Sequence, residues 1–273
     1  MVALRLDDVG AATKRYEVYS NRSWRWGPLR LSGNWLFLKY LPGLKAAGPY
    51  RELRAEEWYE VFTILEETSA RMTVAITAAW ADRADKVTPF PARFPAQAAA
   101  LKEGVRRGLI EIANHGLTHC VLERNLFRPR WFSSNRRYHR EFWDWVPLEV
   151  QESHIRRSQE ILQGHFQVPI VTFVPPGNVF TTDTLAIARR HGLRYVSCNA
   201  PPARLEGLDV IGNENVLAFH DRDLVLNGVG WLRALIARQN SAQCCTVADL
   251  VRSRPPAADG QGESGSHEST DPR

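Results

Sequence analysis

Short apolar runs alternate along this chain with longer segments that have the spacing or end signals of helices. The runs that we expect to be strands cover 2–6, 72–78, 109–113, 169–174, 194–198 and 216–219. The segments that we expect to be helices cover 52–70, 95–107, 149–164, Thr182 to about His191, and 229–239. Strands that alternate with helices pair in parallel, and the helices form the crossover connections. The sequence therefore predicts an α/β fold with mostly parallel strands.

The length of 273 residues suits one large domain, and a hydrophobic content of 44% can supply an ordinary core. We expect that domain to cover residues 1–252, with insertions rich in arginine and aromatic residues near 14–45 and 121–147. Residues 253–273 contain almost no large apolar side chains. Because such a segment cannot bury enough surface to fold, we expect a disordered tail.

The net charge of +5 favours an anionic partner such as a phosphate group. No recognised nucleic-acid-binding module occurs in the sequence, so a nucleic acid partner is not expected. The four cysteines form no C-x-x-C pair and are expected to be reduced: Cys120, Cys198, Cys244 and Cys245. The N-terminus resembles no signal peptide, and no apolar run is long enough for a membrane span. We therefore expect a cytoplasmic protein.

Polar residues that can bind a metal follow two of the expected strands. Asp7 and Asp8 come directly after the first strand, and His115 and His119 follow the strand at 109–113. On a helical turn, a spacing of four residues places two imidazoles on one face, where both can bind one ion. Two histidines and one carboxylate are a common hydrolytic metal site, and a second carboxylate can act as general base. The alternatives are a turn or helix cap for the aspartates and a solvated pair for the histidines.

Four short motifs, in order along the chain, resemble those of the polysaccharide deacetylases, which have the NodB-homology domain and form carbohydrate esterase family 4. Residues 4–10 (LRLDDVG) resemble the first motif, T-F-D-D-G, and residues 114–119 (NHGLTH) resemble the second, H-[ST]-x-x-H. Residues 173–177 (FVPPG) resemble R-x-P-x-G, and residues 217–221 (LAFHD) resemble L-x-x-H. The resemblance covers about residues 2–250. It implies a distorted or incomplete (β/α) barrel with its active site at the C-terminal ends of the strands.

The resemblance also implies a role for each matching residue. One divalent metal, most often zinc and with nickel, cobalt or manganese as alternatives, would be held by Asp8, His115 and His119. Asp7 would be the general base and His220 the general acid. The segment after the third motif would contact substrate through Pro176, Gly177 and Asn178, and a backbone N–H near Gly177 would bind the oxyanion.

The chain departs from the family pattern at three points. The arginine that usually opens the third motif, and that is associated with orienting the base, is Val174 here. The second residue of the histidine motif is Gly116 rather than serine or threonine. The sequence has no convincing counterpart of the family's fourth motif, which is distinct from the last motif, L-x-x-H. Support for the base must therefore come from elsewhere in the chain or be absent.

The insertion at 121–147 alternates arginines with aromatic residues directly after the histidine motif. We expect it to overhang the site and to bind an anionic substrate through Arg130, Trp131 and Arg136. The alternative is a packed lid or an oligomer contact. We assign the other histidines to the surface or to loops, namely His139, His154, His165, His191 and His267, and Cys120 to a small buried position.

These features favour hydrolysis of an N-acyl group, most simply an acetyl group, on an amino sugar inside the cell. The substrate would be a carbohydrate precursor that is nucleotide-linked or lipid-linked, and surface-polysaccharide assembly is the expected pathway. The alternative from another class is a carbohydrate-binding or scaffolding protein that keeps the barrel without catalysis. A third alternative, a nucleic-acid binder, has only the basic charge in its favour.

Overall fold

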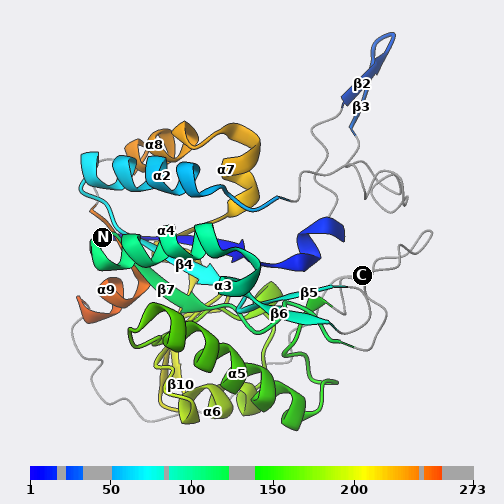
Figure 1. Cartoon of the computed structure of the whole chain (residues 1–273), viewed down its shortest axis with the longest axis vertical. Coiled ribbons are helices and arrows are strands. Elements are labelled where there is room, and N and C mark those ends of the chain that lie inside the picture. Colours follow the sequence, from blue (N-terminus) through cyan, green and yellow to red (C-terminus); the bar gives the residue numbers. More distant parts are fainter. Residues whose placement is uncertain (17–22, 33–50, 83–85, 123–138, 240–242, 254–273) are drawn as a thin grey trace.

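A curled and mostly parallel sheet forms the centre of the computed structural model, which describes residues 1–16, 23–32, 51–82, 86–122, 139–239 and 243–253 (Figure 1). Its strands lie side by side in the order β10 (Ala203–Leu205), β11 (Leu208–Ile211), β9 (Tyr195–Ser197), β8 (Thr172–Phe173), β7 (Ile110–Asn114), β4 (Met72–Ile76), β1 (Val2–Val9) and β12 (Val216–His220). A further short strand, β13 (Cys244–Cys245), pairs with the start of β1. Neighbouring strands are parallel throughout, except β10 and β11.

Helices cover the outer face of this sheet in one layer (Figure 1). The layer consists of α8 (Gly230–Ala237), α2 (Ala55–Glu67), α4 (Pro95–Arg106), α5 (Leu148–Phe166) and α6 (Thr182–Arg190), each in contact with the next. The smaller helices are α3 (Phe90–Arg93), α7 (Asp221–Asn227) and α9 (Val247–Arg252), with 3-10 turns η1 (Ala12–Tyr16), η4 (Pro176–Asn178) and η5 (Asn213–Asn215). The arrangement is a half-barrel with the helices outside and the concave face of the sheet inside.

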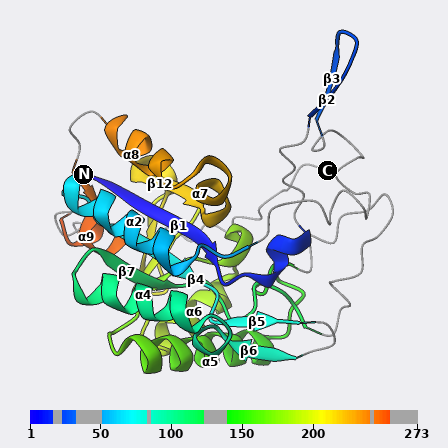
Figure 2. The ribbon, with the colours of Figure 1, turned by 45° about the horizontal axis from the view of Figure 1, so that its top comes forward.

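Two hairpins lie off the main sheet. One pairs β2 (Ser23–Trp26) with β3 (Leu29–Ser32), and the other pairs β5 (Ala79–Ala81) with β6 (Val87–Pro89). Figure 2 shows α2 and α4 along β1, β4 and β7, while the hairpin of β2 and β3 projects away from the sheet. Within the described ranges, no helix has the length and apolar content that a membrane crossing requires.

Alternate side chains of the first strand, β1, point to the two faces of the sheet. Leu4 and Leu6 point toward the helices and join a core that includes Trp58 of α2. Each large apolar side chain that is fully buried there contributes roughly 1.5–3 kcal/mol. Arg5 and Asp7 alternate with the leucines and are also buried, but they face the concave side of the sheet. The concave face of β1 thus carries buried polar side chains. Burying such groups costs free energy unless they are paired, so they indicate either a functional site or a fully paired interior.

The predicted parallel strands and the main helices are confirmed. The predicted end of the first strand was wrong, because β1 continues through Asp7 and Asp8 to Val9. Helix α7, which precedes α8, was not predicted. The antiparallel β10–β11 hairpin was also not predicted. Its turn places Glu206 at φ 50° and Gly207 at φ 75°, and a Glu-Gly pair is a weaker turn signal than Asn-Gly. Most of both insertions and the tail from residue 254 lie outside the described residues.

Candidate metal centre and active site

A β-bulge brings Asp7 and Asp8 to the same side of the sheet. Neighbouring side chains of a regular strand point to opposite faces. Here the pairing of β1 with β4 shifts register between Leu6 and Val9, and Asp8 has a φ of 69°. A bulge of this kind redirects a side chain. Both carboxylates consequently lie near enough to His220, at the end of β12, to raise its pKa electrostatically.

Asp8, His115 and His119 form a buried cluster whose ligand atoms all lie within 4.8 Å of one another. The Asp8 Oδ1 atom is 3.2 Å from His115 Nε2 and 3.4 Å from His119 Nε2. Two ligand atoms that each sit about 2.1 Å from one ion, at tetrahedral or octahedral angles, are roughly 3.0–3.4 Å apart. The two distances from Asp8 Oδ1 therefore match a first coordination shell, and the donor types suit zinc and similar ions.

Hydrogen bonds to the other ring nitrogens orient both imidazoles. His115 Nδ1 lies 2.6 Å from the carbonyl oxygen of Val174, which can only accept, so Nδ1 carries the proton. His115 Nε2 faces Asp8 Oδ1. His119 Nδ1 lies 3.0 Å from the Thr13 hydroxyl, and its Nε2 also faces Asp8. Partners of this kind fix the orientation of metal-binding histidines.

The loop that carries the two histidines is not the helical turn that the spacing suggested. His115 follows β7 directly, Gly116 has a φ of 75° and His119 a φ of 57°. The two rings still approach each other, with centroids 5.0 Å apart. The prediction that the two imidazoles lie together was right, but the prediction that a helical turn brings them together was wrong.

Glu141 holds this loop in shape from inside the insertion. Its side chain is buried and accepts hydrogen bonds from the backbone N–H groups of Leu117, Thr118 and His119. The second residue of the loop must be glycine, because a Cβ atom on Gly116 would lie 2.6 Å from Glu141 Oε1. The departure from the family motif at Gly116 therefore makes room for a carboxylate that stabilises the loop.

Two histidines that we assigned to the surface or to loops are buried instead. His154, on α5, is 6% exposed, and its Nδ1 atom lies 2.6 Å from Glu141 Oε2. His139 is 4% exposed. The assignment was wrong because a histidine on an amphipathic helix can face inward when a carboxylate such as Glu141 meets it. His165 and His191 are half-buried, whereas His267 lies outside the described residues.

The Asp7 carboxylate is held by an arginine that the sequence reasoning did not connect with it. Arg5, two residues earlier in β1, forms a buried ion pair with Asp7 at 2.9 Å. Val174, where the family pattern has its arginine, is buried among Ala75 and Ala113. The alternation of residues in β1 was the available signal, because it places residues 5 and 7 on one face.

His220 is positioned by Asp223, which stands one helical turn later in α7. The backbone N–H of His220 donates to Asp223 Oδ2 at 2.9 Å, and His220 Nδ1 lies 3.6 Å from the same oxygen. The imidazole is 38% exposed, and its Nε2 is 3.9 Å from Asp8 Oδ2. Burial works to lower the pKa of His220, but the bond to Asp223 and the charge of Asp8 outweigh it, so the pKa is raised.

A second arginine and a buried network support the metal ligand Asp8. Arg222 Nη1 donates to Asp8 Oδ2 at 2.9 Å, which leaves Oδ1 for the histidine side of the cluster. Burial works to raise the pKa of Asp8, but hydrogen bonds to the two cluster histidines hold it well below its usual range. Behind Arg222, Lys14 pairs with Glu52 and Asp221. Burial raises the pKa of Asp221 to about 7, with the charge of Lys14 opposing the rise.

The predicted substrate-contact residues divide into two groups. Pro176, Gly177 and Asn178 follow β8 at the same edge of the sheet as the cluster, and Asn178 Oδ1 accepts the backbone N–H of Asn199 at 3.0 Å. Pro176 is buried beside the histidine loop, whereas Gly177 and Asn178 are exposed. The others, Arg130, Trp131 and Arg136, lie outside the described residues, so their role stays a prediction.

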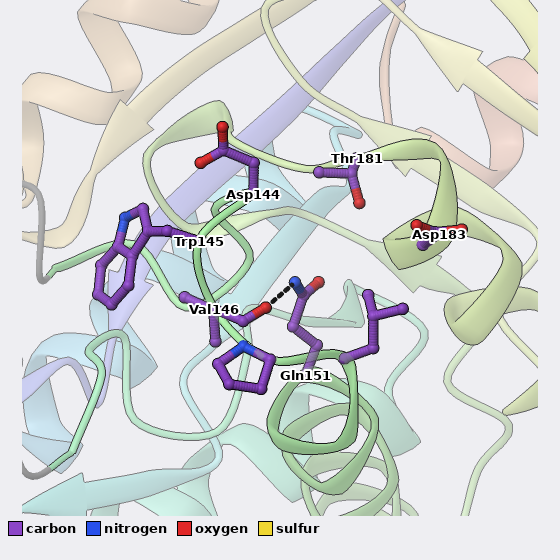
Figure 3. Close-up of a pocket in the computed structure, with 8 residues that line it drawn as sticks. Asp144, Trp145, Val146, Gln151, Thr181 and Asp183 are labelled. Carbon is purple, nitrogen blue, oxygen red and sulfur yellow. Dashed lines mark hydrogen bonds between the residues drawn. The ribbon is translucent and has the colours of Figure 1, made fainter.

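A cavity of about 410 Å³ opens at the N-terminal ends of α5 and α6 (Figure 3). It is lined by residues 144–148 and by Gln151, Thr181 and Asp183. In Figure 3 the Gln151 amide donates to the carbonyl of Val146, at 2.9 Å, and so fixes the wall of the cavity. Because α5 and α6 begin after β7 and β8, the cavity lies at the active-site edge of the sheet, but it contains no member of the metal cluster.

Together, the half-barrel and a buried aspartate–histidine–histidine cluster at its C-terminal strand ends form a site that could hold a metal ion. The family model described as polysaccharide deacetylase matches residues 47–196, more than half of the chain. The chain therefore belongs to the polysaccharide deacetylase family. Among curated proteins no relative matches.

Several solved structures resemble this chain, and the one with a TM-score of 0.50 supports the fold. A protein from Mycobacterium smegmatis, described as a polysaccharide deacetylase, matches with a TM-score of 0.50 and 14% identity over 76% of this chain and 82% of its own. A pseudoenzyme of carbohydrate esterase family 4 from Bacillus anthracis matches with a TM-score of 0.47 and 11% identity over 73% of this chain. The chain spans 62% of the length of that protein. A deacetylase domain from Bordetella bronchiseptica gives 0.41 and 19% identity, covering 62% of this chain and 69% of its own.

Proposed function

We propose that the protein is a metal-dependent carbohydrate N-deacetylase. The observation that carries this proposal is the set of spacings among Asp8 Oδ1, His115 Nε2 and His119 Nε2, with a second carboxylate on the adjacent residue. These residues would hold one divalent metal, for which zinc is the first choice. When bound, such an ion polarises the acyl carbonyl and makes water more acidic. Membership of the polysaccharide deacetylase family supports the same reaction class.

The chain's own residues supply the proton transfers. Asp7 is the general base and takes a proton from the attacking water. His220 is the general acid and protonates the departing amine nitrogen, because an unprotonated amide nitrogen leaves poorly. Water and the N-acetyl group thus become acetate and a free amino sugar. The raised pKa of His220 suits this role, since the acid must stay protonated at neutral pH.

For the substrate we propose an amino sugar that carries a phosphate, either nucleotide-linked or lipid-linked, used in a surface polysaccharide. The net charge of +5 and the arginines of the insertion at 121–147 support an anionic ligand. The four cysteines of the chain are buried and form no disulfide in the structure, which is compatible with the proposed cytoplasmic location.

The test combines metal analysis with acetate release. Apo-protein is loaded with zinc, and acetate release is measured from UDP-N-acetylglucosamine, a lipid-linked N-acetylglucosamine phosphate and an N-acetylglucosamine tetramer. We expect one zinc per chain and faster release from the phosphorylated sugars. His115→Ala should lose the zinc, whereas Asp7→Asn should keep it and lose activity by orders of magnitude. His191→Ala is the matched control, because His191 pairs with Glu152 at the surface, outside the cluster.

Two results would contradict the proposal in different ways. Stoichiometric zinc without acetate release from any of these sugars would favour the alternative, a carbohydrate-binding protein on the same fold. Equal loss of zinc in Asp7→Asn would show that the roles of Asp7 and Asp8 are exchanged. Equal rates with phosphorylated and unphosphorylated sugars would leave the reaction in place and remove the phosphate preference.

A further inference from the structure

The Arg5 guanidinium grips both oxygens of the Asp7 carboxylate. Arg5 Nε donates to Asp7 Oδ1 at 2.9 Å, and Nη2 donates to Oδ2 at 2.9 Å. The side chains are 3% and 9% exposed. A paired contact of this type fixes the plane of a carboxylate as well as its position, which a single contact or an ammonium group cannot do.

The guanidinium is itself held from the opposite part of the sheet. Its third nitrogen, Nη1, donates to Ser197 Oγ at 2.8 Å, and Ser197 is fully buried at the end of β9. Strand β9 is separated from β1 by β8, β7 and β4 in the order of the sheet. Arg5 therefore spans the concave interior, and Asp7 is fixed relative to two distant strands. An arginine that only neutralised Asp7 would not need this second anchor.

The charges of the site are paired one to one before any metal enters. Arg5 contacts Asp7, and Arg222 contacts Asp8 at 2.9 Å. Each arginine uses only part of a carboxylate's capacity, because two oxygens provide about four acceptor sites. Asp8 keeps Oδ1 for the histidine cluster, and Asp7 keeps an acceptor site on Oδ1, because Oδ2 accepts from both Nε and Nη2 of Arg5. The position after β8, where the family pattern has an arginine, holds the buried Val174 here and so provides no cation.

We propose that Arg5 is the positioning residue for Asp7, and that Ser197 in turn positions Arg5. This inference rests on the proposed deacetylase function, in which Asp7 is the base. Arg5 does not contact the reacting atoms. It keeps the carboxylate beside the metal cluster and prevents it from turning toward Asp8's position, where it would bind the ion as a ligand instead of accepting a proton.

The test uses Arg5→Met, Arg5→Lys and Ser197→Ala in the full-length, zinc-loaded protein. Readouts are kcat, KM and zinc affinity, with a crystal structure of the zinc-bound Arg5→Met protein. The rates use the best acetylated sugar from the panel above. The control is Arg71→Ala, which removes a surface pair with Asp249. It should match the wild type in all readouts.

A displacement of the base by about 1 Å can cost on the order of 100-fold in rate. We therefore expect Arg5→Met to lower kcat by about that factor with KM and zinc affinity within about threefold of wild type, and Arg5→Lys to recover part of the loss. Ser197→Ala should fall between wild type and Arg5→Lys. In the Arg5→Met structure, the Asp7 carboxylate should leave its wild-type orientation.

The proposal is overturned if Arg5→Met keeps its kcat per folded molecule, if zinc affinity falls in parallel with kcat, or if Asp7 retains its orientation without Arg5. Should Arg5→Met fail to fold, full activity in both Arg5→Lys and Ser197→Ala overturns it equally. A wild-type protein that binds zinc but releases no acetate contradicts the deacetylase function alone. The orientation of Asp7 in the zinc-bound structures then still decides the role of Arg5.

Discussion

Replacement of Glu141 by alanine should unfold the histidine loop before it affects any other part of the molecule. Glu141 Oε1 accepts the backbone N–H of Thr118 at 2.8 Å and that of His119, and Oε2 accepts the N–H of Leu117 at 3.0 Å. His154 Nδ1 adds a fourth bond at 2.6 Å. One carboxylate thus satisfies three successive backbone donors that lie away from water.

The magnitude follows from those donors. Each buried donor that loses its partner costs about 1–3 kcal/mol, so three of them, with some water entering the vacated space, should cost about 3–5 kcal/mol of the free energy of unfolding. The total stability of a domain is only about 5–15 kcal/mol. Glu141→Gln keeps one carbonyl oxygen and should lose about half as much as alanine, since its NH2 group cannot accept from a backbone N–H.

The assay is urea unfolding at neutral pH together with a zinc titration of each variant. Because His119 belongs to the metal cluster, we expect zinc affinity to fall together with stability in Glu141→Ala. The control is Glu152→Ala, because the Glu152 carboxylate pairs with Arg190 and His191 at the surface; its stability should be nearly that of the wild type. A Glu141→Ala protein within about 0.5 kcal/mol of wild type, with unchanged zinc affinity, would refute the reasoning.

The same contacts predict a pH dependence. Burial works to raise the pKa of Glu141, but the charge of His154 and the hydrogen bonds outweigh it, so the pKa lies below the ordinary value of 4.5. A carboxyl group with a lowered pKa stabilises the fold above its unfolded pKa, and that contribution is lost as the pH falls through the folded pKa. The stability difference between wild type and Glu141→Gln should therefore shrink below about pH 4.5. A difference that stays constant down to pH 3 would contradict this assignment.

Three further predictions follow from single contacts. Asp223→Asn removes the charge that helps to raise the pKa of His220, so the basic limb of kcat/KM should move to lower pH, and an unchanged limb would exclude His220 as the acid. Gly116→Ser restores the usual family residue, but it should lower the free energy of unfolding in urea by at least about 2 kcal/mol. The reasons are the φ of 75° and the contact that a Cβ atom would make with Glu141, and wild-type stability would contradict this. Burial raises the pKa of Cys198 and Cys245 to about 11, so a thiol reagent should label neither in the native protein at pH 8, and rapid labelling would refute their burial.

The order of strands and helices could be predicted because each element carries its own periodic signal. The apolar runs of β1, β4, β7 and β12 are bounded by helices or turns, and their parallel pairing follows from the alternation. Short elements escaped prediction for the opposite reason. The strands β10 and β11 have three and four residues, and the pattern of so few residues does not distinguish a hairpin from a loop.

The candidate metal ligands could be predicted because their spacing and their position after strands are visible in the sequence. The groups that orient them could not, since these contacts join residues far apart in the chain. Glu141 reaches back 22 residues to His119, and Arg222 reaches 214 residues to Asp8. Arg5 is the exception. It stands two residues from Asp7 on the same strand face, so the alternation of β1 contained the signal.

Two of the three departures from the family pattern are each accompanied by a side chain that takes up the vacant place. A glycine at 116 admits the carboxylate of Glu141, and a valine at 174 leaves Asp7 to Arg5. When the histidine motif and the third motif are compared with the family pattern position by position, each lacks a usual residue, because a motif records residue types at fixed spacing. The physical requirements are a loop with satisfied backbone donors and a carboxylate held in one plane, and other side chains from other strands can meet them. We therefore expect the double variant, Gly116→Ser with Glu141→Ala, to lose less stability in urea unfolding than the sum of the two single losses.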